Sequence, residues 1–295
     1  MPEFENIGIV GLGFLGGSLG LAIKKRYIAK KVLGLTRTHE TLIKSEKIGA
    51  IDKGFTSFKE FINEVDFLIL CAPVLSNNKY IKDIISFKPE LFFTDIGSTK
   101  SSIVKYVDSC FSDYHNFVGS HPIAGSEKKG IDFSNSDIFE NKIIILTPGE
   151  KSSPLSVSGI EKFWKSLGGK TFIMDSEKHD EILAYTSHFP HAVIFTLCKT
   201  LEEKINNKEF SLSVGSGLKD TTRIASSSVE MWEEIFLDNS LNVLLLIEKF
   251  KKELDEFEDI LKSKDISRLE KYLYQAKNIR KIIEQNGQKK YSEKS

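Results

Sequence analysis

The chain has 295 residues, of which 41 are basic and 41 acidic, so its formal net charge is zero. This length is sufficient for two domains with substantial cores. A chain without net charge offers no electrostatic footprint for a nucleic acid or an anionic membrane surface, and we expect neither as a partner. Cys71, Cys110 and Cys198 form no Cys-x-x-Cys pair and no zinc-ligand spacing. They predict buried or free thiols in a reducing compartment and no metal site.

Nothing in the sequence indicates targeting to a membrane or to the exterior. The acidic residues 1–6 lead directly into an apolar run and show no signal-peptide pattern. The longest apolar stretch, residues 67–75, is too short to span a bilayer and contains Pro73. We therefore expect a soluble, cytoplasmic protein.

A glycine-rich turn lies between a predicted strand and a predicted helix near the N-terminus. The apolar run Ile7–Val10 is typical of a buried parallel strand, and apolar residues with helical spacing follow from Leu15 to Arg26. In such a context three glycines form a dinucleotide-binding fingerprint: one for the tight turn, one for close approach of the pyrophosphate, and one for helix packing. Three glycines can also form a turn that binds nothing, but the flanking strand and helix favour the dinucleotide. The predicted cofactor contacts here are Gly11, Gly13, Phe14, Leu15 and Gly16.

The second predicted strand, residues 31–35, ends without the acidic residue that binds the 2'-hydroxyl of an adenosine ribose. Thr36, Arg37 and Thr38 stand there instead. A guanidinium beside two hydroxyls suits a 2'-phosphate, so NADP is favoured as the cofactor and NAD remains possible. The alternative is that Arg37 stacks on the adenine or is a solvated loop residue.

Strand-like and helix-like segments alternate up to about residue 175, which predicts a mostly parallel sheet covered by helices on both faces. Ligands of such open sheets bind at the carboxyl ends of the strands. Ala72–Pro73, residues 97–100 and His121 each follow a predicted strand, so they should converge on one crevice. The further predicted strands are residues 65–71, 91–95, 116–119, 143–146 and 171–174.

His121 directly follows an apolar strand and precedes Pro122, which places its side chain toward the crevice. A histidine is more often a structural or surface residue, but this location favours a catalytic one. With an ordinary pKa near 6.5, neutral imidazole can take the hydroxyl proton that must be removed as an alcohol loses hydride. We also expect Ser98 or Thr99 to cap the helix that follows Asp95.

Beyond residue 175 the pattern becomes helical, over residues 177–206 and 229–264, and no clear strand remains. We predict a Rossmann-type α/β fold, with a dinucleotide-binding domain at 1–175 and an all-α substrate and dimerisation domain at 176–295. One apolar stripe predicts either an intrachain core or a helical dimer interface. It consists of Phe250, Leu254, Phe257 and Leu261.

Two histidines flank a proline within this helical part. Pro190 should break one backbone hydrogen bond and turn nearby polar groups sideways. His188 and His191 share a helix face, but no further ligands accompany them, so a metal pair is not favoured.

The loop at residues 215–225 contains small residues and runs into a helix with Arg223. Its guanidinium fork suits a carboxylate. The alternative is a structural ion pair with Asp220 or Glu127.

Five motifs, in this order along the chain, closely resemble the prephenate dehydrogenase family of tyrosine biosynthesis. The resemblance extends over nearly the whole chain. It implies oxidative decarboxylation of prephenate to 4-hydroxyphenylpyruvate by a homodimer with a dinucleotide-binding and a helical dimerisation domain. The motifs are Gly11–Ser18, Asp95–Lys100, His121–Glu127, Ser187–His191 and Lys219–Arg223.

The resemblance also implies roles for single residues. His121 would be the partner of the substrate's ring hydroxyl, with Ser98 bonded to the imidazole and to the nicotinamide. Arg223 would bind a substrate carboxylate. The remaining contacts implied are those of His191, from the helical domain, and of Ser126 and Glu127, which would line the pocket.

Three rival functions remain at this point, one of them a different dehydrogenase that shares the cofactor domain. An arogenate dehydrogenase would accept an amino group in place of the keto group, and His191 favours prephenate because this position often differs in arogenate-specific members. A non-catalytic NADP-sensing module would explain the glycine turn but would leave His121 and Arg223 without a task.

Overall fold

The computed structural model describes residues 3–124 and 130–292. The chain divides into two compact units, Met1–Val243 and Leu244–Ser295. The predicted domain boundary after residue 175 stays a prediction. Among the described residues, no helix combines the length and the apolar character needed to cross a membrane.

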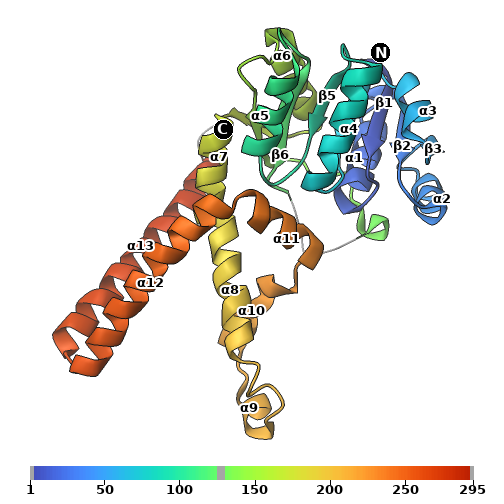
Figure 1. The fold of residues 1–295 in the computed structure, drawn as a ribbon. Helices are drawn as coiled ribbons and strands as arrows, with labels where there is room; N and C mark the ends of the chain where they lie inside the picture. The colour runs from blue at the N-terminus through green and yellow to red at the C-terminus, as the bar shows by residue number, and fades with distance from the viewer. Residues whose placement is uncertain (1–2, 125–129, 293–295) are drawn as a thin grey trace. The chain divides into compact units, whose positions relative to one another are not determined.

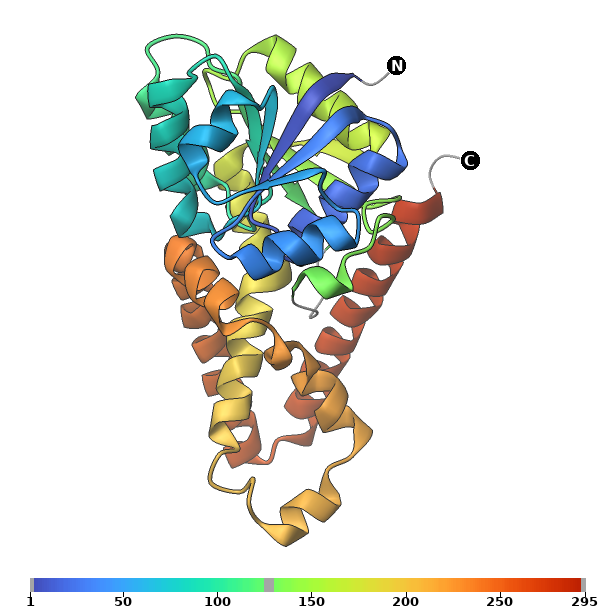
Figure 2. The same cartoon turned by 90° about the vertical axis from the view of Figure 1, so that its right-hand side faces the viewer.

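The first unit contains an eight-stranded sheet with the order β3-β2-β1-β4-β5-β6-β7-β8 (Figures 1 and 2). Every neighbouring pair is parallel except β6 and β7. This doubly wound order confirms the predicted Rossmann-type class. The strands are β1 (Phe4–Val10), β2 (Ala29–Leu35), β3 (Lys53–Phe55), β4 (Phe67–Leu70), β5 (Phe92–Asp95), β6 (Phe117–Pro122), β7 (Ile143–Thr147) and β8 (Lys170–Ile173).

Two features of the sheet differ from the sequence-based expectation. Strand β3 was not predicted, because it has only three residues, includes Gly54 and pairs only with the end of β2. Strand β6 is longer than the predicted 116–119: it continues through His121, which pairs with Ile145 of the antiparallel β7. His121 therefore lies in the last part of a strand and not in the loop after it.

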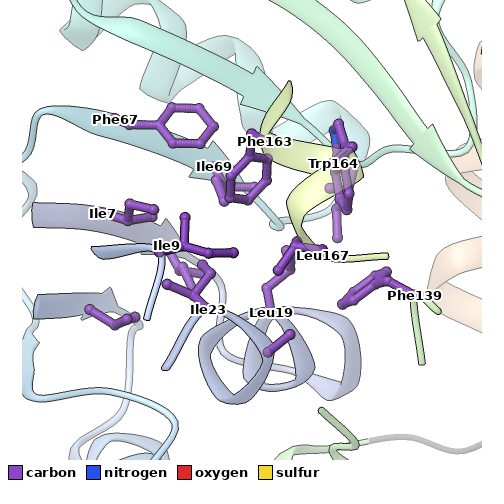
Figure 3. Packing of buried hydrophobic residues seen from close by; sticks show 14 of the residues in the cluster. Ile7, Ile9, Leu19, Ile23, Phe67, Ile69, Phe139, Phe163, Trp164 and Leu167 are labelled. Carbon is purple, nitrogen blue, oxygen red and sulfur yellow. The ribbon is translucent and has the colours of Figure 1, made fainter. Parts of the chain in front are cut away.

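Alternation along the strands explains the two layers of helices. Phe67 and Ile69 of β4 belong to one hydrophobic core, and Leu68 and Leu70 belong to another. The first core is completed by α1 and α6, and Figure 3 shows Phe163 of α6 close to Ile69. The second core is completed by α3, α4 and α5. The helices of this layered part are α1 (Phe14–Lys25), α2 (His39–Lys47), α3 (Phe58–Asn63), α4 (Val74–Phe87), α5 (Ser101–Cys110) and α6 (Pro154–Ser166), with a 3-10 turn at Ile131–Phe133.

The rest of the chain is helical, as predicted. The predicted helix 177–206 is interrupted by a π-helical turn at Ala184–His188, directly before Pro190 in the first turn of the next helix. Proline has no N–H to donate and its ring displaces the preceding carbonyl, so the wider turn accommodates it. The elements are α7 (Ser176–Leu183), α8 (Phe189–Thr200), α9 (Lys208–Ser213), α10 (Ser216–Thr222), a 3-10 turn (Arg223–Ser226), α11 (Val229–Asp238), α12 (Ser240–Ser263) and α13 (Ile266–Ser292).

The second unit is formed by most of α12 together with α13. Phe257 of α12 contacts Tyr272 of α13, with ring centroids 5.5 Å apart, so part of the apolar stripe packs within the chain. Leu254 and Leu261 of the same stripe are 50% and 52% exposed. The stripe is therefore only partly covered by its own chain.

Candidate active site

The glycine turn has the geometry that a dinucleotide requires. Gly11 has φ +91°, a conformation that favours glycine, and a Cβ there would lie 2.7 Å from the Cys71 carbonyl oxygen. A Cβ at Gly16 would lie 2.0 Å from the carbonyl oxygen of Gly11, whereas one at Gly13 would meet nothing within 4 Å. Two glycines thus allow strand, turn and helix to pack closely, and the third leaves the start of α1 open. These residues fit a pyrophosphate at the helix N-terminus.

Three strand ends converge beside this turn. The Gly11 amide donates to the Leu35 carbonyl at 2.8 Å, and the Cys71 amide donates to the Val10 carbonyl at 2.7 Å. Thr36, directly after β2, and Ala72–Pro73, after β4, are therefore brought next to the glycine turn. The residues predicted to contact the cofactor lie at one edge of the sheet.

The loop after β2 carries no acidic side chain. Arg37 and Thr38 are exposed, and among the described residues Arg37 forms no salt bridge. The Thr38 hydroxyl lies 2.8 Å from the Thr41 hydroxyl in the first turn of α2. The guanidinium is thus accessible beside the position of the adenosine ribose in folds of this class.

His121 is the first member of a hydrogen-bonded chain of three side chains. Its Nδ1 lies 2.8 Å from Nε2 of His179, and Nδ1 of His179 lies 2.8 Å from Oδ1 of Asp180. A carboxylate only accepts, so Nδ1 of His179 donates and its Nε2 accepts from Nδ1–H of His121. Neutral His121 therefore keeps its lone pair on Nε2. No described residue forms a hydrogen bond with that nitrogen.

Asp180 is held by several donors. Its carboxylate accepts from the backbone amides of Lys100 and Ser101 at 2.8 Å each, and its carbonyl accepts from the Asn239 side-chain amide at 2.8 Å. The prediction that Ser98 or Thr99 caps α5 was wrong. The N-cap is Lys100, without a side-chain cap, because the carboxylate of Asp180 in α7 takes the amides instead.

The electrostatics of the cluster favour neutral imidazoles. Desolvation lowers the pKa of His121 well below its usual 6.5, and positive charge on His179, Lys100 or His188 lowers it further. Burial also lowers the pKa of His179, although Asp180 opposes this shift. Burial lowers the pKa of His188 to about 4. His121 is thereby kept as a base at neutral pH.

Ser98 lies at the same edge of the sheet but makes no hydrogen bond with His121 in the structure. It is partly exposed in the turn between β5 and α5, and the neighbouring Thr99 hydroxyl is buried without a partner among the described residues. At either end of this turn, the buried side chains of Asp95 and Lys100 form an ion pair. The role of Ser98 stays a prediction.

The helical side of the cluster is built around Trp232 of α11. The His191 ring stacks on it, with centroids 3.8 Å apart, and the His188 ring meets it edge-on at 6.1 Å. Asn239 donates to Nδ1 of His188 at 2.9 Å as well as to the Asp180 carbonyl, so this group adjoins the His121 chain. The exposed Arg223 begins the 3-10 turn that packs against α8, the helix that carries His191.

Ser126 and Glu127 lie outside the described residues. Among the residues that are described, no three His, Cys, Asp or Glu side chains gather as a metal site.

Sequence reasoning missed His179, Asp180, Asn239 and Trp232. The available signal was the adjacent pair His179–Asp180 in a short helix, where both side chains are buried. Buried polar residues in such a helix require partners, and partners near a strand end indicate a site.

Comparison with known proteins agrees with this geometry. The family model described as the nucleotide-binding domain of prephenate dehydrogenase matches residues 19–173, and the model of its dimerization domain matches residues 175–290. The chain belongs to the prephenate dehydrogenase family.

Individual family members are similar over most of their length. Prephenate dehydrogenase of Bacillus subtilis is 33% identical over 94% of this chain and 75% of that protein. A structure of prephenate dehydrogenase from Aquifex aeolicus, in complex with hydroxyphenyl propionate and NAD+, has a TM-score of 0.88 and 34% identity, covering 95% of this chain and 98% of that one. Synechocystis arogenate dehydrogenase shares the fold, with a TM-score of 0.78 and 24% identity over 94% and 99% of the two chains.

Proposed function

We propose that this protein is a prephenate dehydrogenase, which oxidises and decarboxylates prephenate to 4-hydroxyphenylpyruvate in tyrosine biosynthesis. The observation that carries the proposal is the orientation of His121. Its Nδ1 is committed to His179 and Asp180, so its Nε2 is the proton acceptor at the carboxyl end of β6. The strand ends that surround the glycine turn lie along the same edge of the sheet.

The cofactor is a nicotinamide dinucleotide, which supplies the hydride acceptor when bound. Gly11, Gly13 and Gly16 form its pyrophosphate cradle, and Ala72 and Pro73 border it after β4. We expect Phe14 and Leu15, in the first turn of α1, to line the same cradle.

His121 and its partners handle the proton. As hydride leaves the ring carbon that bears the hydroxyl, Nε2 of His121 takes the hydroxyl proton, which prevents an oxocarbenium charge from building up. The bond from the ring to its carboxylate then breaks, CO2 leaves, and the electron pair makes the ring aromatic. His121 returns its proton to the oxygen, which becomes the phenol. We expect Ser98 to form hydrogen bonds with the imidazole and with the nicotinamide.

Arg223, His191, Ser126 and Glu127 make up the proposed substrate pocket. The Arg223 fork binds a carboxylate, and His191 is held in place by stacking on Trp232 and by its 2.8 Å bond to the Ser187 carbonyl. The second candidate is arogenate dehydrogenation, the activity named for the Synechocystis protein that shares this fold. The two substrates differ in a keto and an amino group, and we expect His191 to discriminate between them.

The assay that tests this function incubates the purified protein with prephenate or arogenate and follows the reduced nicotinamide. We expect turnover of prephenate with release of one CO2 per hydride. Turnover of arogenate alone would support the second candidate, and turnover of neither would contradict both.

We further propose that NADP is used better than NAD. The exposed Arg37, flanked by Thr36 and Thr38, replaces the acidic ribose ligand, and one charge-assisted hydrogen bond is worth about 1.5–3 kcal/mol, or roughly ten- to a hundredfold in preference. The A. aeolicus complex contains NAD+, so that relative points the other way.

The cofactor test compares kcat/KM with the two dinucleotides in the wild type, Thr36→Asp and Arg37→Ala. Thr36→Asp should reverse the preference, and Arg37→Ala should weaken only NADP. A wild type that prefers NAD would contradict the proposal, as would a ratio that neither change alters.

We also propose a homodimer with residues 1–175 as the dinucleotide-binding domain and 176–295 as the substrate and dimerisation domain. The match of a dimerization-domain model to residues 175–290 supports both statements. Helix α8 is largely apolar, yet none of its side chains is fully buried within the chain, so a second copy is expected to cover the part left open. Light scattering should give about twice the chain mass of 33.3 kDa at micromolar concentration, and a monomer would contradict the dimer.

A further inference from the structure

A buried ion pair lies beside the His121 chain and takes no part in the mechanism above. Asp95 ends β5 and Lys100 precedes α5, and their side chains are only 1% and 0% exposed. A buried pair contributes little net stability, because the loss of hydration offsets most of the attraction between the charges. Its presence next to the proton acceptor therefore calls for another explanation.

The pair is connected to both ends of the His121 chain. Oδ2 of Asp95 accepts from Lys100 Nζ and from the Gly97 amide at 2.8 Å, while its Oδ1 faces the Ser120 amide at 3.4 Å. The Lys100 amide donates to Asp180 at 2.8 Å. A closed ring of contacts thus runs from the backbone next to His121, through the ion pair, to Asp180, and back through His179 to the imidazole.

The side chain of Lys100 also fits closely against β6. A Cβ at Gly119 would lie 3.2 Å from Cδ of Lys100 and 2.5 Å from Oγ1 of Thr147. The lysine stem therefore crosses the strand at a glycine, two residues before His121.

We propose that Lys100, paired with Asp95, is a positioning residue for the proton transfer. The pair clamps the turn that carries Ser98 and the strand end that carries His121, and it holds both in register with the His179–Asp180 pair. The inference rests on the proposed function, because it assigns His121 as the proton acceptor.

The pair also has an electrostatic effect. The groups that face His121 are His179 on α7, Lys100 ahead of α5 and His188 in the π turn, while Asp180 and Asp95 face His179. Among them, the charge of Lys100 opposes protonation of His121. Removing it should raise the pKa of His121.

The main test is the double variant Asp95→Asn/Lys100→Met, since Lys100→Met alone leaves a buried carboxylate without a countercharge. We expect a folded protein in which KM for prephenate and Kd for the reduced dinucleotide change less than about twofold. A small misplacement of catalytic groups should lower kcat about 10- to 100-fold. In the pH profile of kcat, the fall on the acid side (the acid limb) should move to higher pH. Lys100→Arg keeps the charge but changes the geometry, so it should lower kcat without moving that limb.

The matched control is Asp108→Asn, which removes the carboxylate of the His115–Asp108 pair just before β6. It should lower the melting temperature and leave kcat and its acid limb unchanged. If the double variant behaves like this control, or if both Lys100 variants keep wild-type kcat, the ion pair is structural and the proposal is wrong.

A measurement without substrate separates this proposal from the proposed function. In protein labelled with 15N-histidine, the His121 signals are assigned by their loss in His121→Asn and titrated in the free protein. The pKa of His121 should be higher in Asp95→Asn/Lys100→Met than in the wild type. An equal pKa contradicts the proposed effect of the ion pair on His121 even if prephenate is turned over, and a higher one supports it even if the substrate is a different alcohol.

Discussion

Two histidines lie near opposite ends of strand β6, and each is hydrogen-bonded to other side chains. His115, just before the strand, uses both ring nitrogens: Nε2 lies 2.7 Å from Asp108 Oδ1, and Nδ1 accepts from the Phe117 amide at 3.2 Å. His121, near the other end, uses only Nδ1, and among the described residues nothing occupies its Nε2. A histidine with both nitrogens satisfied stabilises the fold, whereas one whose second nitrogen is held open can exchange a proton.

The partners of the two histidines differ in their distance along the chain. Asp108 lies seven residues from His115 and also accepts from the backbone amides of Glu150 and Lys151 at 2.9 and 3.3 Å, so it fastens one loop. His179 lies 58 residues from His121, on a helix after the last strand. The site at the end of β6 therefore forms only when α7 packs against the carboxyl edge of the sheet.

The largest expected effect is the difference in kcat between the same substitution made at each of the two histidines. His121→Asn should lower kcat by about 100- to 10,000-fold, the range for losing a general base, with nearly unchanged dinucleotide binding. His115→Asn should leave kcat within a few fold and lower the free energy of unfolding. Steady-state kinetics measure kcat, and chemical denaturation measures the free energy of unfolding. Comparable kcat losses in the two variants would remove the distinction drawn here.

The second substitution addresses the partner rather than the base. His179→Phe removes the acceptor for Nδ1–H of His121 and lets the imidazole rotate, so we expect kcat to fall about 100-fold. KM for prephenate should change little, because His179 is buried and does not reach the substrate. Asp108→Asn serves as the control. Full activity of a folded His179→Phe protein would show that His121 is oriented by something else.

Arg223 should affect binding more than turnover. Arg223→Ala should raise KM for prephenate at least tenfold while KM for the dinucleotide changes less than about twofold, because the lost contact is a charge-assisted bond to the substrate carboxylate. Arg223→Lys should recover only part of the loss, since an ammonium lacks the planar fork. Equal changes in both constants would indicate a structural ion pair.

The last prediction concerns the pH dependence of stability. Burial lowers the pKa of His188 from about 6.5 to about 4, so between these values the unfolded chain binds a proton that the folded chain does not. Stability is therefore complete above pH 6.5 and falls as the pH approaches 4, by up to about 3 kcal/mol for this residue. His188→Gln should flatten this slope in denaturation curves measured at several pH values. An unchanged slope would place the proton uptake on other groups.

The sequence predicted those features that depend on neighbours in the chain. The glycine turn needs only a strand before it and a helix after it, and β4 lies within the predicted strand 65–71, whose residues 67–70 are all apolar. His121 was found because a strand precedes it and Pro122 follows. Local rules failed where a distant group intervened: Ser98 and Thr99 are sound helix caps by composition, but the carboxylate of Asp180, 80 residues away, reaches the amide of Lys100 first. Strand β3 was missed because three residues at the edge of the sheet are too few to show a periodic hydrophobic pattern.

The pH dependence of kcat tests the central claim, that a neutral His121 is the proton acceptor, most directly. The pKa of His121 is lowered well below 6.5, so kcat measured at saturating prephenate and dinucleotide should stay constant as the pH falls through 6.5 and should decline only in more acidic solution. His121→Asn should retain low activity without this acid limb. An acid limb at or above pH 6.5 in the wild type, or the same limb in His121→Asn, would contradict the account.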